Sequence, residues 1–300
     1  MNIKIFIPII MFALYSTCAL SQNPNKEDLE NRIVLNAGNS INTENFEGFP
    51  MILPDGLTLY FSSDRSGGLG DLDIYVTHRA KMKDAWEDPI QLNSSINSVA
   101  SDHSVTISSD GHYMYFTSEK EGGFGDADLY MSYRKDINDD FGWGEANNLG
   151  EFVNTDSLEA CPLFHHENGE THLYYVSSRD KGLGGMDFYY SSWDKEKNQF
   201  QKPIWLKDVS SPSEDMHFEP VKGLIWSDRS GGIGQSDIWI ATFDSSEKKW
   251  KEPTCLKYPI NTEHREGMPS VTHDFSELYF HSNRPGGIGS YDIYVAVREQ

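Results

Sequence analysis

A stretch that occurs five times constrains the fold of this chain most strongly. Its clearest copy runs from Tyr60 to Val76 and reads YFSSDRSGGLGDLDIYV. An Asp near the end of each copy falls at positions 73, 128, 187, 237 and 292, in steps of 55, 59, 50 and 55 residues. A period of this length is close to that of the four-stranded blade of a β-propeller. The sequence therefore predicts a repeat protein of five units.

Each unit has the residues of four antiparallel strands. Two short runs rich in Tyr, Phe, Ile and Val flank a glycine cluster, which indicates a hairpin whose loop needs positive φ. An apolar stretch upstream ends in a turn pair such as Asp55-Gly56, which adds an inner strand. Downstream, Trp86 and Pro89 precede another short stretch, and proline suits an edge strand. This last stretch is therefore predicted to be the outermost strand of its blade.

The two ends of the chain are predicted to complete one blade together. Only residues 296–300 follow the last copy, so the fifth unit lacks an outer strand of its own. Residues 33–35 and 39–43 match the outer-strand segments of the other units. Pairing this N-terminal strand with the strand that contains Tyr294 would close the ring and remove exposed sheet edges. The expected fold is an all-β, five-bladed β-propeller with four-stranded antiparallel blades, the last closed by the N-terminal strand.

The predicted domain boundaries follow from this repeat. We expect a signal peptide at 1–21, a flexible lead-in at 22–30 and a single propeller at 31–300. The blades are expected at approximately 46–97, 98–154, 155–211, 212–262, and 263–300 together with 31–43.

The repeated pattern resembles a known family. It consists of an acid followed by Pro, a turn, Leu-Tyr-Phe-Ser-Ser, Asp-Arg, Gly-Gly-x-Gly and Asp-Ile-Tyr. This order of elements resembles the TolB-type, WD-repeat-like β-propeller of bacterial envelope proteins. This resemblance covers nearly all of the expected mature chain, and it implies a protein- or glycan-binding or scaffold module of the envelope. We accordingly predict a non-catalytic binding propeller. The alternative is a carbohydrate-active hydrolase or lyase with carboxylates at the mouth of the central channel.

The N-terminal residues and the charge bear on location and partners. Lys4, an apolar run and Ala19-Leu20-Ser21 predict a secretory signal that is cleaved before Gln22, and hence a periplasmic or secreted protein. Lipidation at Cys18 is less favoured, because the three residues before it suit a lipoprotein signal poorly. A net charge of −21 disfavours nucleic acid and anionic lipid. The expected partner is an envelope protein or glycan, bound by a monomer without a transmembrane segment.

One set of candidate residues recurs in every unit and is interpreted as structural. Each glycine loop combines a basic residue with the Asp of the repeat. We predict that the Asp locks the turn by accepting backbone N–H groups of the loop and by pairing with the base. The pairs are Arg65 with Asp73, Lys120 with Asp128, Arg179 with Asp187, Arg229 with Asp237, and Arg284 with Asp292.

A second set precedes the innermost strands and is expected at the rim of the channel. Its members are Glu47, Asp102, Glu159, His217, Glu219 and Glu266. Carboxylates that converge there could hold a metal ion, bind a cationic ligand, or supply the acid and base of glycoside cleavage. The other interpretation is that each caps the backbone of a neighbouring blade, and their recurrence with the repeat favours it. His103, His165 and His166 add imidazoles at a spacing that matches no zinc motif.

A third candidate is a calcium loop. Asp136, Asn138, Asp140 and Glu145 alternate oxygen ligands around Gly142, although glycine falls one place later than in the usual calcium loop. A polar turn between two strands would have the same composition. No other cofactor is expected.

Overall fold

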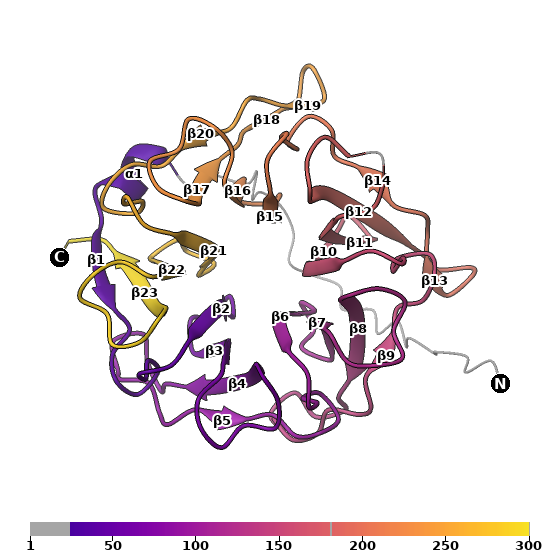
Figure 1. Ribbon diagram of the computed structural model, residues 1–300, viewed down its shortest axis with the longest axis horizontal. Helices are drawn as coiled ribbons and strands as arrows, with labels where there is room; N and C mark the ends of the chain where they lie inside the picture. The colour runs from indigo at the N-terminus through magenta and orange to yellow at the C-terminus, as the bar shows by residue number, and fades with distance from the viewer. Residues whose placement is uncertain (1–24, 181, 300) are drawn as a thin grey trace.

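The structure is a computed structural model that describes residues 25–180 and 182–299, and it forms a ring of five β-sheet blades (Figure 1). The predicted fold class is confirmed. The ring is built around its five innermost strands, which lie closest to its centre in Figure 1. They are β2 (Glu47–Ile52), β6 (Asp102–Ile107), β10 (Glu159–Glu167), β15 (Asp215–Glu219) and β21 (Glu266–Val271).

The remaining strands follow outward in each blade. The second strands are β3 (Thr58–Ser63), β7 (Tyr113–Ser118), β11 (Glu170–Ser177), β16 (Leu224–Ser227) and β22 (Glu277–Ser282). The third strands are β4 (Asp73–His78), β8 (Asp128–Tyr133), β12 (Asp187–Asp194), β17 (Asp237–Ile240) and β23 (Asp292–Val297). The outer strands are β5 (Ile90–Gln91), β9 (Asn147–Asn148), β14 (Ile204–Trp205), β20 (Thr254–Cys255) and β1 (Ile33–Asn36). Short extra strands are β13 (Gln199–Phe200), β18 (Phe243–Asp244) and β19 (Lys249–Trp250).

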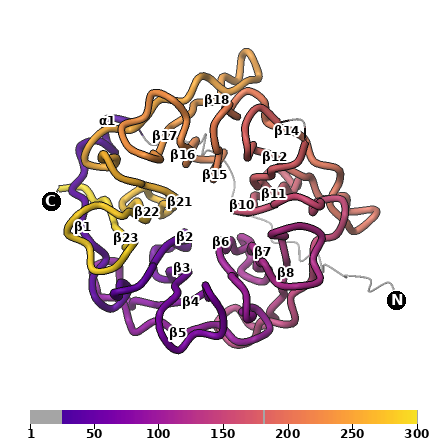
Figure 2. Tube along the Cα trace, in the orientation of Figure 1, coloured from indigo at the N-terminus to yellow at the C-terminus, as the bar shows by residue number. Residues whose placement is uncertain are grey.

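The N-terminal strand closes the ring, as the sequence predicted. β1 pairs with β23 in antiparallel register, from Ile33 opposite Val297 to Asn36 opposite Tyr294. Figure 2 shows the indigo start of the described chain beside its yellow end. This pairing gives blade 5 its fourth strand and leaves β1 as the outer edge of that sheet. Head and tail of the ring are thereby held by backbone hydrogen bonds.

Neighbouring blades cover both faces of each sheet. Alternate side chains of a strand point to opposite faces, so Tyr60 of β3 packs with Val105 of blade 2. Its neighbour Phe61 instead joins Tyr279 and Ile293 of blade 5. All of these side chains are buried. This explains why the strands read as nearly continuous apolar runs, because a neighbouring blade covers most of each face.

The start of the described chain differs from the prediction. Residues 26–30, expected within a flexible lead-in, form the helix α1 (Lys26–Glu30), which is capped by Asn25. The helix is ordered because Leu29 is fully buried against blades 4 and 5, and Asp28 accepts a hydrogen bond from Arg32 at 2.7 Å. The predicted signal peptide at 1–21 lies outside the described residues.

The inner hairpins of blades 3 and 4 differ sharply in length. In blade 3, β10 and β11 pair out to Glu167 opposite Glu170. In blade 4, β15 ends at Glu219, which lies opposite Leu224. The longest innermost strand thus lies next to the shortest one, and this mismatch shapes the site described below.

Candidate functional site

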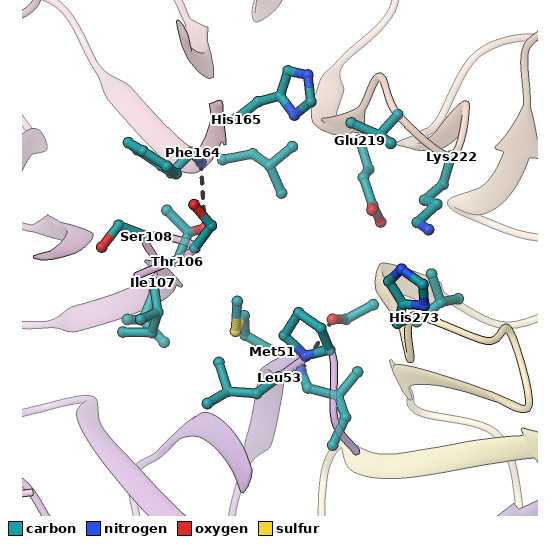
Figure 3. A pocket seen from close by; sticks show the side chains of 18 of the residues that line it. Met51, Leu53, Thr106, Ile107, Ser108, Phe164, His165, Glu219, Lys222 and His273 are labelled. Atoms are coloured by element: carbon teal, nitrogen blue, oxygen red, sulfur yellow. Dashed lines mark hydrogen bonds between the residues drawn. The ribbon is translucent and has the colours of Figure 1, made fainter. Parts of the chain in front are cut away.

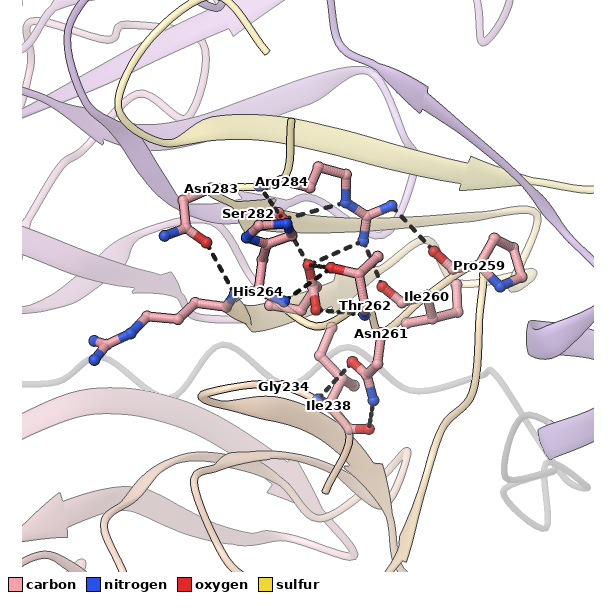
Figure 4. A network of polar contacts seen from close by, with 12 residues as sticks. Gly234, Ile238, Pro259, Ile260, Asn261, Thr262, His264, Ser282, Asn283 and Arg284 are labelled. Carbon is pink, nitrogen blue, oxygen red and sulfur yellow. Dashed lines mark hydrogen bonds and ion pairs between the residues drawn. The ribbon is translucent and has the colours of Figure 1, made fainter. Parts of the chain in front are cut away.

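Every innermost strand begins with a fully buried acid. In blade 5 this acid is Glu266, which accepts hydrogen bonds from the backbone N–H and the hydroxyl of Thr262, both at 2.8 Å, and from Ser282 at 2.7 Å. Figure 4 shows this network. The equivalent acids, all 0% exposed, are Glu47, Asp102, Glu159 and Asp215. Each binds the Thr or Ser four residues before it, so these acids hold the linker between blades and do not line the channel rim.

An arginine completes the network in four blades. Arg284 lies 3.3 Å from Glu266 and also donates to the carbonyl of Ile260. The corresponding ion pairs are Arg65 with Glu47 at 3.3 Å, Arg179 with Glu159 at 3.1 Å, and Arg229 with Asp215 at 2.6 Å. The arginines therefore fasten each blade to the segment that enters it.

The predicted pairing of these bases with the repeated Asp is wrong. The predicted backbone contacts of this Asp are confirmed, because in blade 5 Asp292 accepts the N–H groups of Ile288 at 2.6 Å and Gly289 at 2.8 Å. The first of these contacts, from the backbone N–H four residues earlier, is also made by Asp73, Asp128, Asp187 and Asp237. The carboxylate lies so close beneath the loop that a Cβ at Gly287 would come within 2.7 Å of it. The repeat thus contains two separate locks, one inside the loop and one between blades.

Blade 2 has an incomplete lock, which leads to a testable prediction. Lys120 replaces the arginine, and its ammonium lies 3.8 Å from the centroid of the Tyr130 ring. Among the described residues, Oδ1 of the buried Asp102 has no hydrogen-bond partner, and burial raises the pKa of this carboxyl. Lys120→Arg should supply the missing donor and raise the free energy of unfolding by about 1 kcal/mol. Urea denaturation measures it, with the exposed Lys135→Arg as control; a lower midpoint for Lys120→Arg would contradict the account.

Aromatic rings gather near the axis where the innermost strands begin. Phe49 stacks on His103 with centroids 4.8 Å apart, and its ring also lies 5.5 Å from His281 and 6.3 Å from Trp226. The N–H of Phe49 donates to Nδ1 of His281 at 3.2 Å. Burial lowers the pKa of His281 to about 3, so its imidazole is neutral. These four rings come from blades 1, 2, 4 and 5 and pack against one another across the axis.

A cavity of about 540 Å³ lies at the other end of the innermost strands. Its wall is formed by the last residues of these strands and by the turns that follow them, including Met51, Ile107, Phe164, Glu219 and His273. Figure 3 shows these side chains around the central space. Aliphatic and aromatic groups make up much of the wall, and a few ionisable groups reach into it. This composition is typical of a small-molecule site.

Glu219 is the ionisable group that stands out in this cavity. Its carboxylate has no hydrogen-bond partner among the described residues, and Figure 3 shows it pointing toward the ammonium of Lys222. Burial raises the pKa of Glu219 to about 7, while the positive charge of Lys222 opposes the shift. Burial in turn lowers the pKa of Lys222, whose ammonium lies 4.0 Å from the Phe275 ring centroid. A carboxyl that stays protonated near neutral pH can act as an acid.

Other ionisable groups of the cavity come from three further turns or strands. Burial lowers the pKa of His165, which lies 3.5 Å from Glu167. Asp55 and Asp110 stand in the turns after β2 and β6, and each uses Oδ1 to cap its own turn. The other oxygen of each has no partner among the described residues. His217 has an unpartnered Nδ1 and is 2% exposed.

The buried imidazole of His217 predicts a pH dependence of stability. Burial lowers its pKa to about 4 from 6.5, so the unfolded chain binds the proton first as the pH falls. Stability is therefore lost below the unfolded pKa, by about 2 kcal/mol at pH 5 for this one group. His217→Met, which copies the position of Met268 in blade 5, should remove this loss. Urea denaturation at pH 7 and pH 5 measures it; a difference between variant and wild type that does not grow at pH 5 would refute the prediction.

Only two of the predicted channel-rim residues line the cavity, namely His217 and Glu219. Glu47, Asp102, Glu159 and Glu266 begin their strands and so lie at the opposite end, inside the locks. Sequence reasoning missed Asp215 as the fourth member of that set, although it follows Ser211 by the same four residues as the other pairs. It also missed Lys222, Asp55 and Asp110 as cavity residues.

The predicted calcium loop does not form an ion site. Asp140 lies 2.7 Å from His78 and 3.4 Å from Arg134, and Asp136 caps the backbone N–H of Asn138. Glu145 lies apart from these contacts, near Ser95 at 3.5 Å. Within residues 25–180 and 182–299, no group of three or more His, Cys, Asp and Glu side chains could hold a metal ion. In the same ranges, no helix is long and apolar enough to cross a membrane.

The sequence matches no protein-family profile and no curated protein. Solved structures do share its fold. An α-L-arabinofuranosidase from Lactobacillus brevis is 12% identical, with a TM-score of 0.55, over 84% of this chain and 90% of that one. A family 117 glycoside hydrolase from Zobellia galactanivorans is 13% identical, with a TM-score of 0.56, over 90% and 91%. The α-L-arabinofuranosidase PaAbf62A from Podospora anserina is 13% identical, with a TM-score of 0.52, over 88% and 92%.

These matches correct the family and the activity that the sequence suggested. The proteins reported above are glycoside hydrolases, which contradicts the TolB-type, WD-repeat-like assignment and the prediction of a non-catalytic binding or scaffold module. The same matches contradict the expectation of a binding protein in preference to an enzyme. The physical reason is that the repeat encodes turns and blade contacts, which propellers of different activities have in common.

Proposed function

We propose that this protein is a carbohydrate-active hydrolase that cleaves a glycosidic bond in the cavity, with Glu219 as the general acid. The observation that supports it is the free carboxyl group of Glu219, whose pKa burial raises to about 7 within a cavity of about 540 Å³. Glycoside hydrolysis uses a carboxylic acid that remains protonated near neutral pH and gives its proton to the leaving oxygen.

The remaining groups of the cavity fit the other needs of this reaction. A second carboxylate must activate water or attack the sugar, and Asp55 or Asp110 takes this role with its uncapped oxygen. Lys222 keeps the pKa of the acid from rising further, so that the ionised and protonated forms of Glu219 exchange near neutral pH. The aliphatic wall around Met51, Ile107 and Leu163 limits water around the bond.

A panel of 4-nitrophenyl glycosides tests this proposal directly. The proteins that share the fold include α-L-arabinofuranosidases, so α-L-arabinofuranosides are the first substrates to try, followed by β-D-xylosides and polymeric arabinan and xylan. We expect nitrophenol release from at least one glycoside at about pH 6, where Glu219 is mostly protonated. The absence of turnover on the whole panel by folded protein would overturn the proposal.

A further inference from the structure

A strip of aromatic side chains lies beside the cavity, where blade 3 extends past blade 4. β10 has nine residues, from Glu159 to Glu167, whereas β15 has five, from Asp215 to Glu219. The face of blade 3 that looks toward blade 4 is therefore not fully covered near the cavity. Four aromatic side chains on this face are half-buried: His165, His172, Tyr174 and Tyr190.

The four rings form a continuous surface. Tyr174 and Tyr190 stack with centroids 5.5 Å apart and planes inclined by 29°. His172 lies edge-on to Tyr190 at 5.5 Å, and His165 lies 6.5 Å from Tyr174. Strand pairing holds this arrangement in place. His165 of β10 lies opposite His172 of β11, and Tyr174 of β11 lies opposite Tyr190 of β12.

The aromatic residue at position 190 is peculiar to blade 3. The equivalent position, three residues after the repeated Asp, is held by Val76, Met131, Ile240 and Val295 in the other blades. Three of these are buried against the next blade, namely Val76, Met131 and Ile240. Tyr190 is only half-buried, because the neighbouring hairpin of blade 4 is short. Its presence at this position therefore needs an explanation other than core packing.

The strip joins the cavity through His165, which belongs to both. A glycan whose scissile bond lies at Glu219 would leave the cavity on this side and place its next ring against Tyr174 and Tyr190. Flat aromatic faces suit the apolar C–H face of a sugar. At the edge of the strip, Glu167 and Glu170 lie 3.5 and 3.6 Å from His165 and His172 and offer acceptors to hydroxyl groups.

We propose that the strip of His165, His172, Tyr174 and Tyr190 is a second sugar-binding subsite, which makes the protein select oligosaccharides over single glycosides. This inference rests on the proposed function, since it concerns the neighbouring sugar of the same substrate.

The test compares two substrates of the sugar that the glycoside panel identifies, its 4-nitrophenyl glycoside and its trisaccharide. The double variant Tyr190→Val/His172→Thr carries residues that the repeat already uses, since Val76 and Thr58 hold these positions in blade 1. We expect KM for the trisaccharide to rise about tenfold, while kcat and the kinetics of the nitrophenyl glycoside stay within about twofold. Tyr133→Val, at an exposed tyrosine of blade 2, is the matched control.

The outcomes separate this inference from the proposed function. Equal trisaccharide KM values in the double variant and wild type, with both substrates cleaved, would overturn the subsite and leave the hydrolase intact. If wild-type protein cleaves no glycoside of the panel, the hydrolase fails, and calorimetric binding of a trisaccharide of L-arabinofuranose, the first sugar of the panel, decides the subsite. Weaker binding to the double variant than to wild type would then support it, and equal binding would overturn it. If the double variant does not fold, the single variant His172→Thr replaces it in the same comparison.

Discussion

Replacing Glu219 by Gln should lower kcat/KM for an oligosaccharide or alkyl glycoside by about 10²- to 10⁴-fold, the usual contribution of a positioned general acid. Gln keeps the size of the side chain and cannot donate the proton that the leaving oxygen needs. The carboxyl has no hydrogen-bond partner among the described residues, so the substitution breaks no hydrogen bond of the fold. Steady-state kinetics of the purified variant measure the loss.

The leaving group makes this prediction specific to acid catalysis. A 2,4-dinitrophenolate departs without protonation, so Glu219→Gln should cleave the dinitrophenyl glycoside far better, relative to wild type, than it cleaves the alkyl glycoside. Glu263→Gln, at a side chain 87% exposed, controls for loss of a surface charge. An equal loss on both leaving groups would exclude Glu219 as the proton donor.

Replacing Arg229 by Met should destabilise the protein by about 3–5 kcal/mol, because it leaves the fully buried carboxylate of Asp215 without its partner at 2.6 Å. The guanidinium also holds the carbonyl of Val209, so the linker into blade 4 loses a donor as well. Burial already raises the pKa of Asp215, and loss of the opposing charge would raise it further. Urea or thermal denaturation at pH 7 measures the loss of stability.

A double-mutant cycle shows whether the charge is the cause. Asp215→Asn in the Arg229→Met background should recover part of the lost stability, since a neutral amide is cheaper to bury than an unpaired carboxylate. The exposed Arg265→Met should change stability by at most about 0.5 kcal/mol. A loss below about 1 kcal/mol in Arg229→Met, similar to that of a surface arginine, would contradict the role of the lock between blades.

The ring and its closure could be predicted from the sequence because the signals are local and repeated. Each copy carries its own turn glycines, and the unpaired segment around Val34 matched the outer strands of other units. The acids were harder to place. Glu47 and Glu219 are both acids of innermost strands, but one begins its strand and the other ends it, and this decides which end of the channel each reaches.

The chemistry of the site depends on contacts that no single repeat encodes. The raised pKa of Glu219 comes from burial by several blades, and the strip near Tyr190 exists because two neighbouring hairpins differ in length. The hairpin that contains Lys222 is shorter than those of the other blades, and this obscured the match of Asp215 to the other strand-opening acids. The repeat motif suggested the wrong function because its residues form turns, which propellers of different activities have in common.

The most direct test of the account is the pH dependence of kcat/KM for a glycoside that the protein cleaves. Because the protonated form of Glu219 is the proposed acid, activity should fall about tenfold per pH unit above an apparent pKa near 7, and this alkaline limb should be missing from the residual activity of Glu219→Gln. An alkaline limb of the same position and slope in both proteins would show that another group donates the proton and would contradict the account.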